Sequence, residues 1–176
     1  MGLAMKATLF VSSYAPMLLL FGVLDTFGIE PLRWALIVLG AASLGLLPIM
    51  FFVAKKNGNP RTLQLTEAKP KDIEMLAFFA SYVVPFTTVA PGNATRTWGL
   101  IVFLVLTAGI YLRNGLYYLN PIIALLGFKV FDVKIEGGTS ALMITRRKYV
   151  EQTQAIAVVR LEQRLYLDVS GTGKQD

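Results

Sequence analysis

Four long apolar segments constrain this chain more than any other feature of its sequence. They cover residues 7–24, 34–54, 75–91 and 97–113, and two short gaps and one basic loop separate them. The first segment has 18 residues and no charge. As a helix it would span about 27 Å, close to the thickness of a membrane hydrocarbon core. We therefore expect a membrane α-helical protein, with a four-transmembrane-helix bundle in residues 1–119.

The basic residues are distributed unevenly about these segments. Of the 17 Lys and Arg residues, only Arg33 and Arg96 fall in the gaps after the first and third segments. The other 15 lie before the first segment, in the loop 55–74, at the end of the fourth segment or after it. Cytoplasmic loops of membrane proteins are enriched in Lys and Arg. The pattern thus places both termini and the middle loop in the cytoplasm and predicts a multi-pass protein of the bacterial inner membrane.

Cations at the ends of the apolar segments are expected to meet the lipid headgroups. Lys55 and Lys56 follow the second segment, and Arg113 ends the fourth. Long basic side chains reach from a helix end to the interface, where anionic lipids attract them. We therefore predict membrane-interface contacts for these three residues, with membrane lipids as partners.

Two boundaries leave alternatives open. A cleaved signal peptide is a second interpretation of the first segment, since Lys6 could serve as its basic region. We prefer a retained helix, because the apolar run is long and Pro16 directly follows the small-x-small triplet 13–15. At the other end, Asn120-Pro121 should stop or bend the fourth helix. That helix ends near Arg113 or continues to Leu119, and residues 122–126 then form an interfacial segment.

After residue 128 the pattern changes to the two-residue period of β-strands. Residues 129–135 alternate, a glycine-containing turn at 136–140 follows, and a second apolar stretch begins at residue 141. This arrangement predicts a β-hairpin. Residues 160–169 also alternate and predict a third strand. We therefore expect residues 120–176 to form an interfacial segment and a small C-terminal cytoplasmic antiparallel β-sheet. Its apolar face would pack on the membrane interface, on a second copy of the chain or on a cytosolic partner, and its open edges suit docking.

The predicted docking surface lies within residues 129–169. Its partner-binding residues would be Phe131, Val133, Ile135, Arg146, Arg147, Lys148, Arg160, Arg164 and Tyr166. The chain after Arg113 carries eight basic and six acidic residues. Because this charge is nearly balanced, we do not expect the tail to bind nucleic acid directly.

Two apolar segments carry a similar polar pattern that allows two interpretations. Ser13 and Tyr14 precede Pro16 in the first segment, and Ser81 and Tyr82 precede a proline in the third. A functional interpretation is an intramembrane polar site between kinked helices, as in a carrier. The structural interpretation is that these hydroxyls bind backbone groups and hold helices together. We favour the structural interpretation.

The composition also argues against catalysis. The chain has no Cys and no His, so it lacks thiolate chemistry and the commonest general base and metal ligand. Gly137-Gly138 fits a hairpin turn rather than a phosphate loop. Asp25 and Glu30 are interpreted as solvated acids in an external loop. We expect no enzyme, no cofactor and no bound metal.

Three stretches of the sequence resemble a known family. They are KATLFVSSYAPMLLLF at residues 6–21, the Ser81-Tyr82 segment with Pro85, and YLNPIIALLGFKVFDV at residues 118–133. These residues and the overall layout resemble the membrane subunit of Kiwa, a two-component bacterial anti-phage system. The resemblance implies four transmembrane helices, a membrane-embedded oligomer that senses envelope disturbance, and a cytosolic DNA-binding partner. It carries no site residue over to this chain.

These observations favour one function over two others. The leading hypothesis is a non-enzymatic membrane sensor or scaffold that recruits a cytosolic effector through residues 129–169. Small residues between Gly40 and Gly45 would let another helix approach closely, which suits a homo-oligomer. The alternatives are a small channel or transporter that uses the Ser/Tyr/Pro segments, and a membrane assembly factor.

Overall fold

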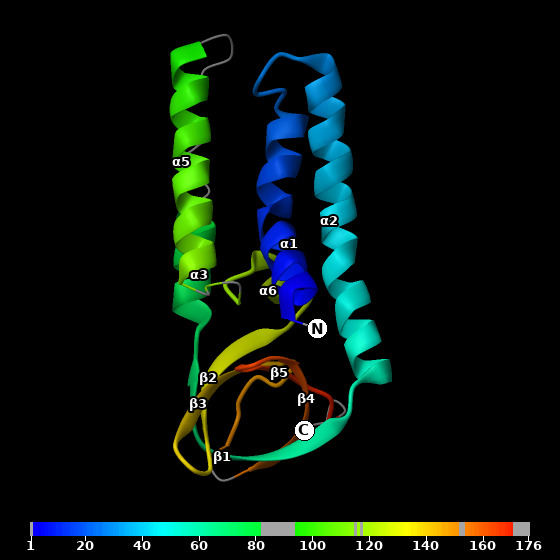
Figure 1. Ribbon diagram of the computed structural model, residues 1–176, viewed down its shortest axis with the longest axis vertical. Coiled ribbons are helices and arrows are strands. Elements are labelled where there is room, and N and C mark those ends of the chain that lie inside the picture. The colour runs from blue at the N-terminus through cyan, green and yellow to red at the C-terminus, as the bar shows by residue number, and fades with distance from the viewer. Residues whose placement is uncertain (1, 82–93, 115, 117, 152–153, 171–176) are drawn as a thin grey trace.

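The structure is a computed structural model that describes residues 2–81, 94–114, 116, 118–151 and 154–170. Apolar helices stand on one side of a five-stranded β-barrel (Figure 1). The helices are α1 (Gly2–Val23), α2 (Glu30–Asn57), α3 (Asp72–Ser81), α5 (Ala94–Arg113) and α6 (Pro121–Leu125). The strands are β1 (Pro60–Pro70), β2 (Lys129–Ile135), β3 (Thr139–Thr145), β4 (Ala155–Glu162) and β5 (Leu165–Asp168).

Helices α1 and α2 pack along each other as a helical hairpin (Figure 1). Glycines permit their close approach. A methyl group at Gly40 would lie 2.7 Å from Cγ of Leu19, and one at Gly22 would lie 2.5 Å from Cγ1 of Ile37. A methyl group at Gly45 would meet no atom within 4 Å. Part of the small-residue patch on α2 therefore receives α1 of the same chain.

The described helices contradict the predicted four-transmembrane-helix bundle. Only two of them are long and apolar enough to cross a membrane: Met5–Val23 within α1, with 19 residues, and α2, with 28. Among the described residues, the apolar stretch of α5 is shorter and runs from Trp98 to Tyr111. This length falls below the roughly 20 residues that a hydrocarbon core requires. Residues 82–91 of the predicted third span, with Tyr82, lie outside the described residues.

The strands form a closed barrel in the order β1-β2-β3-β5-β4. Strand β1 pairs with both β2 and β4, while β3 and β5 run parallel. The predicted β2–β3 hairpin is confirmed, and Gly137 and Gly138 adopt the positive φ angles that its turn needs.

Two other predictions, one for the middle loop and one for the tail, are wrong. Residues 60–70, which we expected within a basic loop, form β1 and close the barrel. Residues 160–169, expected as one strand, turn at 163–164 and divide between β4 and β5. The small open antiparallel sheet is therefore replaced by a barrel that has no open edge.

The barrel has two apolar faces, one on each side of its strands. Seven buried side chains fill its interior: Leu65, Phe131, Val133, Ala141, Met143, Ile156 and Val158. A second cluster lies outside the barrel and packs against the helices. Its strand residues are Val130, Ile144, Leu161, Leu165 and Leu167, and its helix residues include Leu9, Leu47, Phe51, Ile122 and Ile123. Each buried side chain of this size contributes about 1.5–3 kcal/mol, so this second cluster fixes the barrel to the helices.

Candidate functional site at the barrel–helix junction

Asn120 holds the short helix α6 in place between the helices and the barrel. Its side-chain oxygen accepts a hydrogen bond from the Ile122 amide at 2.9 Å, which caps the helix. Its Nδ2 donates to Oγ of Ser12 at 2.7 Å and to the Leu9 carbonyl at 3.1 Å, both on α1. Pro121 then occupies the first helical position, where its missing N–H costs nothing. The predicted interruption at Asn120-Pro121 thus orients α6 so that its Ile122 and Ile123 side chains are buried.

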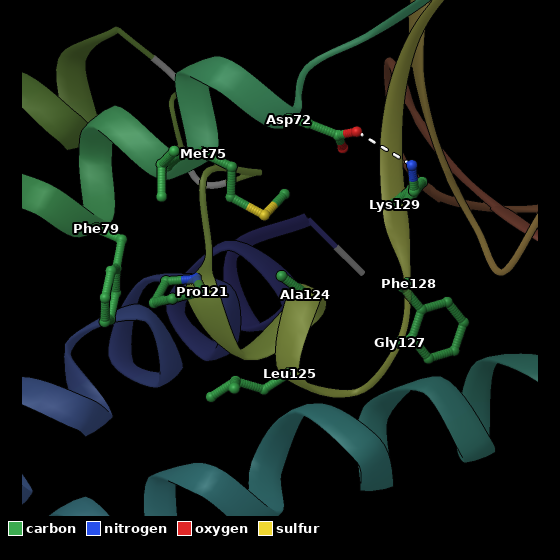
Figure 2. Close-up of a pocket in the computed structure, with 10 residues that line it drawn as sticks. Asp72, Met75, Phe79, Pro121, Ala124, Leu125, Gly127, Phe128 and Lys129 are labelled. Carbon is green, nitrogen blue, oxygen red and sulfur yellow. Dashed lines mark hydrogen bonds and ion pairs between the residues drawn. The ribbon is translucent and has the colours of Figure 1, made fainter. Parts of the chain in front are cut away.

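A cavity of about 530 Å³ opens beside α6, between α3 and the start of β2 (Figure 2). Its volume falls within the roughly 300–1,000 Å³ of small-molecule pockets. Ten residues line it: Asp72, Met75, Leu76, Phe79, Pro121, Ala124, Leu125, Gly127, Phe128 and Lys129. Eight of the ten are apolar or glycine, and the other two, Asp72 and Lys129, form an ion pair at 3.2 Å. The cavity therefore combines an apolar interior with a charged mouth.

Further ion pairs tie α3 to the barrel next to this cavity. Lys71 Nζ lies 2.6 Å from Oε1 of Glu74 and 3.8 Å from Oδ2 of Asp132 on β2. The hydrogen bond to Glu74 raises the pKa of Lys71. The Tyr118 hydroxyl donates to the other Glu74 oxygen at 3.4 Å. The start of α3, the chain before α6, and β2 are thus joined by polar contacts.

The structure places the predicted partner-binding residues in different environments. Phe131 and Val133 are buried inside the barrel, and Ile135 and Tyr166 are half-buried and pack against the same interior cluster. Lys148, Arg160 and Arg164 are exposed. Arg160 and Arg164 lie on β4 and in the β4–β5 turn, so they belong to a different segment from the run 146–148.

Side-chain contacts of Arg147 hold the segment 146–149, which we name the 146–149 loop. Arg147 Nε lies 3.1 Å from Oδ2 of Asp168, and its terminal nitrogen donates to Oγ of Ser170 at 2.9 Å. The Thr145 hydroxyl donates to the same Asp168 oxygen at 2.6 Å. Arg146 stacks over the Phe128 ring, with 4.6 Å from Cζ to the ring centroid. The neighbouring side chains Lys148 and Tyr149 remain exposed on a fixed loop.

Sequence reasoning missed Tyr149, which is 76% exposed. An aromatic residue directly after three cations could have indicated an interface, because Tyr and Arg are enriched at binding hot spots. The cavity had no comparable signal, since its walls come from segments separated by more than 40 residues.

Two of the predicted intramembrane polar residues, Ser13 and Ser81, donate hydrogen bonds to backbone carbonyls of their own helices. The Ser13 hydroxyl donates to the Phe10 carbonyl at 2.7 Å, and the Ser81 hydroxyl donates to the Phe78 carbonyl at 2.6 Å. The Tyr14 ring lies 5.1 Å from the Phe10 ring. Such bonds from a serine hydroxyl to a carbonyl one turn earlier are common in helices.

Tyr111 of α5 joins three helices through ring contacts. Its ring lies 5.6 Å from Phe10 and 6.4 Å from Tyr14 on α1, and 5.2 Å from Phe78 on α3. Arg113 follows on the exposed end of α5, and Lys55 and Lys56 are exposed in the last turn of α2. The three predicted interface cations therefore lie at the ends of helices next to the barrel. Among the described residues, no group of three or more His, Cys, Asp or Glu side chains is placed to hold a metal ion.

Two helices of membrane-spanning length packed on a closed β-barrel define a helix-anchored barrel protein. The chain belongs to the family described as anti-phage protein KwaA, whose model matches residues 5–167. It is also 30% identical over 83 residues to the Kiwa protein KwaA of Escherichia coli O55:H7 (strain RM12579 / EPEC). That match covers 47% of this chain and 42% of the relative, so it spans less than half of either protein. No solved structure matches the chain significantly.

The resemblance to Kiwa that the sequence indicated is thereby confirmed. The family places the chain in anti-phage defence. The two helices of spanning length support association with a membrane.

Proposed function

We propose that this chain is a non-enzymatic, multi-pass membrane subunit of an anti-phage defence system that presents its barrel to a cytosolic protein partner. The observation that carries the proposal is the firm packing of a closed barrel against one end of the apolar helices. A barrel fixed in this way moves with its helices. A disturbance of the membrane segment would therefore change the surface that a partner meets.

Charge supports a cytoplasmic barrel. The barrel side of the helices carries Lys6, Lys55, Lys56 and Arg113, together with the cations of the barrel itself. The opposite ends of α2 and α5 carry only Arg33 and Arg96. By the preference of Lys and Arg for the cytoplasmic side, the barrel and both termini would lie in the cytoplasm.

The 146–149 loop is the proposed docking surface. Tyr149 is exposed, Lys148 and Arg146 flank it, and the Arg147–Asp168 pair keeps the loop in place. A rigid aromatic side chain among cations suits an acidic protein surface, because little conformational entropy is lost on binding. Arg160 and Arg164 would extend this surface along β4 and the β4–β5 turn.

Exposed apolar faces support the homo-oligomeric part of the proposal. Helix α2 exposes Val38, Leu39, Ile49 and Phe52, and α5 exposes Val102, Val105, Leu106 and Ile110. In a membrane these faces would contact lipid or other copies of the chain. Ala41 and Ala42 lie exposed on α2 as well, where small side chains let a neighbouring helix approach.

The proposal is tested by phage plating on cells that carry the complete defence system. Lys148→Ala/Tyr149→Ala should lose protection while the membrane content of the protein stays unchanged. Arg61→Ala/Thr62→Ala is the matched control, since it removes one cation and one exposed neighbour on β1. Full protection by the Lys148/Tyr149 variant would refute the docking surface.

A further inference from the structure

We propose that the cavity between α3, α6 and β2 holds an acyl chain of an anionic phospholipid, with the lipid phosphate at its charged mouth. This inference rests on the membrane orientation proposed above. The lipid contacts predicted from the sequence involve only cations at helix ends, whereas this site would bind one lipid in a defined pocket.

The position of the cavity is the first argument. It lies where the apolar helices meet the barrel, and Phe128 of its lining packs against Phe51 of α2, one helical turn before Lys55. Lys55 and the neighbouring Lys56 would mark the headgroup layer of the cytoplasmic leaflet. An opening at that depth faces lipid headgroups and the upper parts of acyl chains rather than bulk water.

The walls are the second argument. Met75 and Phe79 of α3 face Pro121 and Ala124 of α6 across the cavity (Figure 2). Leu76 and Leu125 also line it, and they are 67% and 76% exposed. Exposed leucines at the rim of an apolar cavity would be unfavourable in water, whereas contact with hydrocarbon removes that cost. The cavity thus opens sideways through an apolar rim.

The cations near the mouth are the third argument, because they favour a lipid with an anionic headgroup. Lys129 lies at one end of the cavity, paired with Asp72 at 3.2 Å. Arg146 stacks on Phe128, a lining residue, and forms no ion pair among the described residues. Phe51 packs against the same Phe128 ring at 5.0 Å, and Lys55 follows Phe51 by one helical turn. Arg146, a cation without an acidic partner in the described part of the chain, thus stacks directly on the cavity lining, where its charge complements a phosphate group.

A photolabelling experiment on the full-length protein tests the inference. The protein is reconstituted in phosphatidylcholine vesicles that contain a phosphatidylglycerol with a diazirine on its acyl chain. A phosphatidylcholine with the same acyl diazirine is the second probe. Labelled peptides are then mapped by mass spectrometry. We expect the phosphatidylglycerol probe to label residues 72–79 and 121–128 more strongly than the exposed faces of α2 and α5.

Three variants distinguish labelling of the cavity from labelling of the lipid-facing surfaces of α2 and α5. Ala124→Trp should fill the cavity from an exposed position and remove most of this label, while labelling of α2 and α5 continues. Ala41→Trp, an exposed alanine on α2 outside the cavity, should leave the cavity label unchanged. Arg146→Gln should reduce the preference for phosphatidylglycerol over phosphatidylcholine.

Two outcomes would overturn the inference. Equal cavity labelling by the two probes would reject the anionic headgroup, and an unchanged cavity label in Ala124→Trp would reject the acyl site. An absence of label on α2 and α5 as well would instead refute the membrane insertion on which the inference rests.

Discussion

Lys6 Nζ lies 3.2 Å from Oε1 of Glu162, and this ion pair joins the beginning of α1 to the end of β4. The Glu162 side chain is almost completely buried, whereas that of Lys6 is about half exposed. A buried carboxylate depends on its partner, because its loss of hydration must be compensated. The pair therefore connects a helix of membrane-spanning length to the barrel at a point where separation is costly.

Removal of Lys6 should weaken this connection. Lys6→Ala leaves the Glu162 carboxylate buried without its ion-pair partner, and we expect a loss of about 1–3 kcal/mol in the free energy of unfolding. In Lys6→Ala/Glu162→Gln much of that loss should be recovered, because the buried charge is gone. Denaturant unfolding of the purified variants in detergent measures both effects. Strictly additive losses in the double variant would contradict this account of the pair.

Close packing of α1 on α2 should depend on Gly40. The added methyl group of Gly40→Ala would lie 2.7 Å from Leu19 Cγ and 3.0 Å from the Leu19 backbone nitrogen, so the helices would have to separate. Such overpacking typically costs about 1–3 kcal/mol. Gly45→Ala is the matched control, since its methyl group meets open space and alanine favours a helix. A comparison of thermal unfolding in detergent should show a lower midpoint for Gly40→Ala alone; equal midpoints would argue against close packing at Gly40.

Stability in acid should depend on Glu67 of β1. Its carboxylate lies 2.5 Å from Lys134 and 2.8 Å from Lys69, and hydrogen bonds from these two lysines lower its pKa from 4.5 to about 2. Because the folded state favours the charged form, the contribution of Glu67 is complete above its usual pKa and disappears as the pH falls toward about 2. The stability difference between the wild-type protein and Glu67→Gln should therefore shrink between about pH 6 and pH 2.

A second variant serves as the control for the pH dependence expected of Glu67→Gln. Glu136→Gln alters an exposed carboxylate in the β2–β3 turn that forms no ion pair among the described residues. Its difference from the wild-type protein should stay small at every pH. If the Glu67→Gln difference were constant over this pH range, the Lys134–Glu67–Lys69 contacts would not stabilise the barrel as described.

The parts of the fold that sequence reasoning predicted are those with local signals. The hairpin of β2 and β3 follows from alternation and from Gly137-Gly138, which supply the positive φ angles of its turn. Strand β1 has no such signal, since Leu63 and Leu65 are its only large apolar residues and Pro60 and Pro70 bound it. It forms because β2 and β4 pair with it on both sides, which is a tertiary effect.

Closure of the barrel also changed the candidate site. In an open sheet, Phe131 and Val133 would face a partner, but a closed barrel has an interior, and these side chains fill it. The Asn120-Pro121 interruption was visible in the sequence, whereas the hydrogen bonds of Asn120 to α1 join residues more than 100 positions apart. The cations of the proposed docking surface could be named from the sequence, because Lys and Arg are charged wherever they lie.

The orientation in the membrane can be tested with single cysteines, since the chain has none of its own. Glu30→Cys places a thiol at the start of α2, and Thr139→Cys places one on the exposed β3 end of the hairpin. A membrane-impermeant maleimide should label Glu30→Cys in intact spheroplasts and Thr139→Cys only after lysis. The reverse pattern would place the barrel outside the cytoplasm.

Recruitment of a cytosolic partner by the barrel is the central claim, and quantitative co-purification tests it most directly. The tagged protein is solubilised from its native host, and copurifying proteins are measured for the wild-type chain, Lys148→Ala/Tyr149→Ala and the control Arg61→Ala/Thr62→Ala. We predict one stoichiometric cytosolic protein that the control retains and the Lys148/Tyr149 variant loses. A preparation without a stoichiometric partner, or a partner that all three proteins retain equally, would contradict the claim.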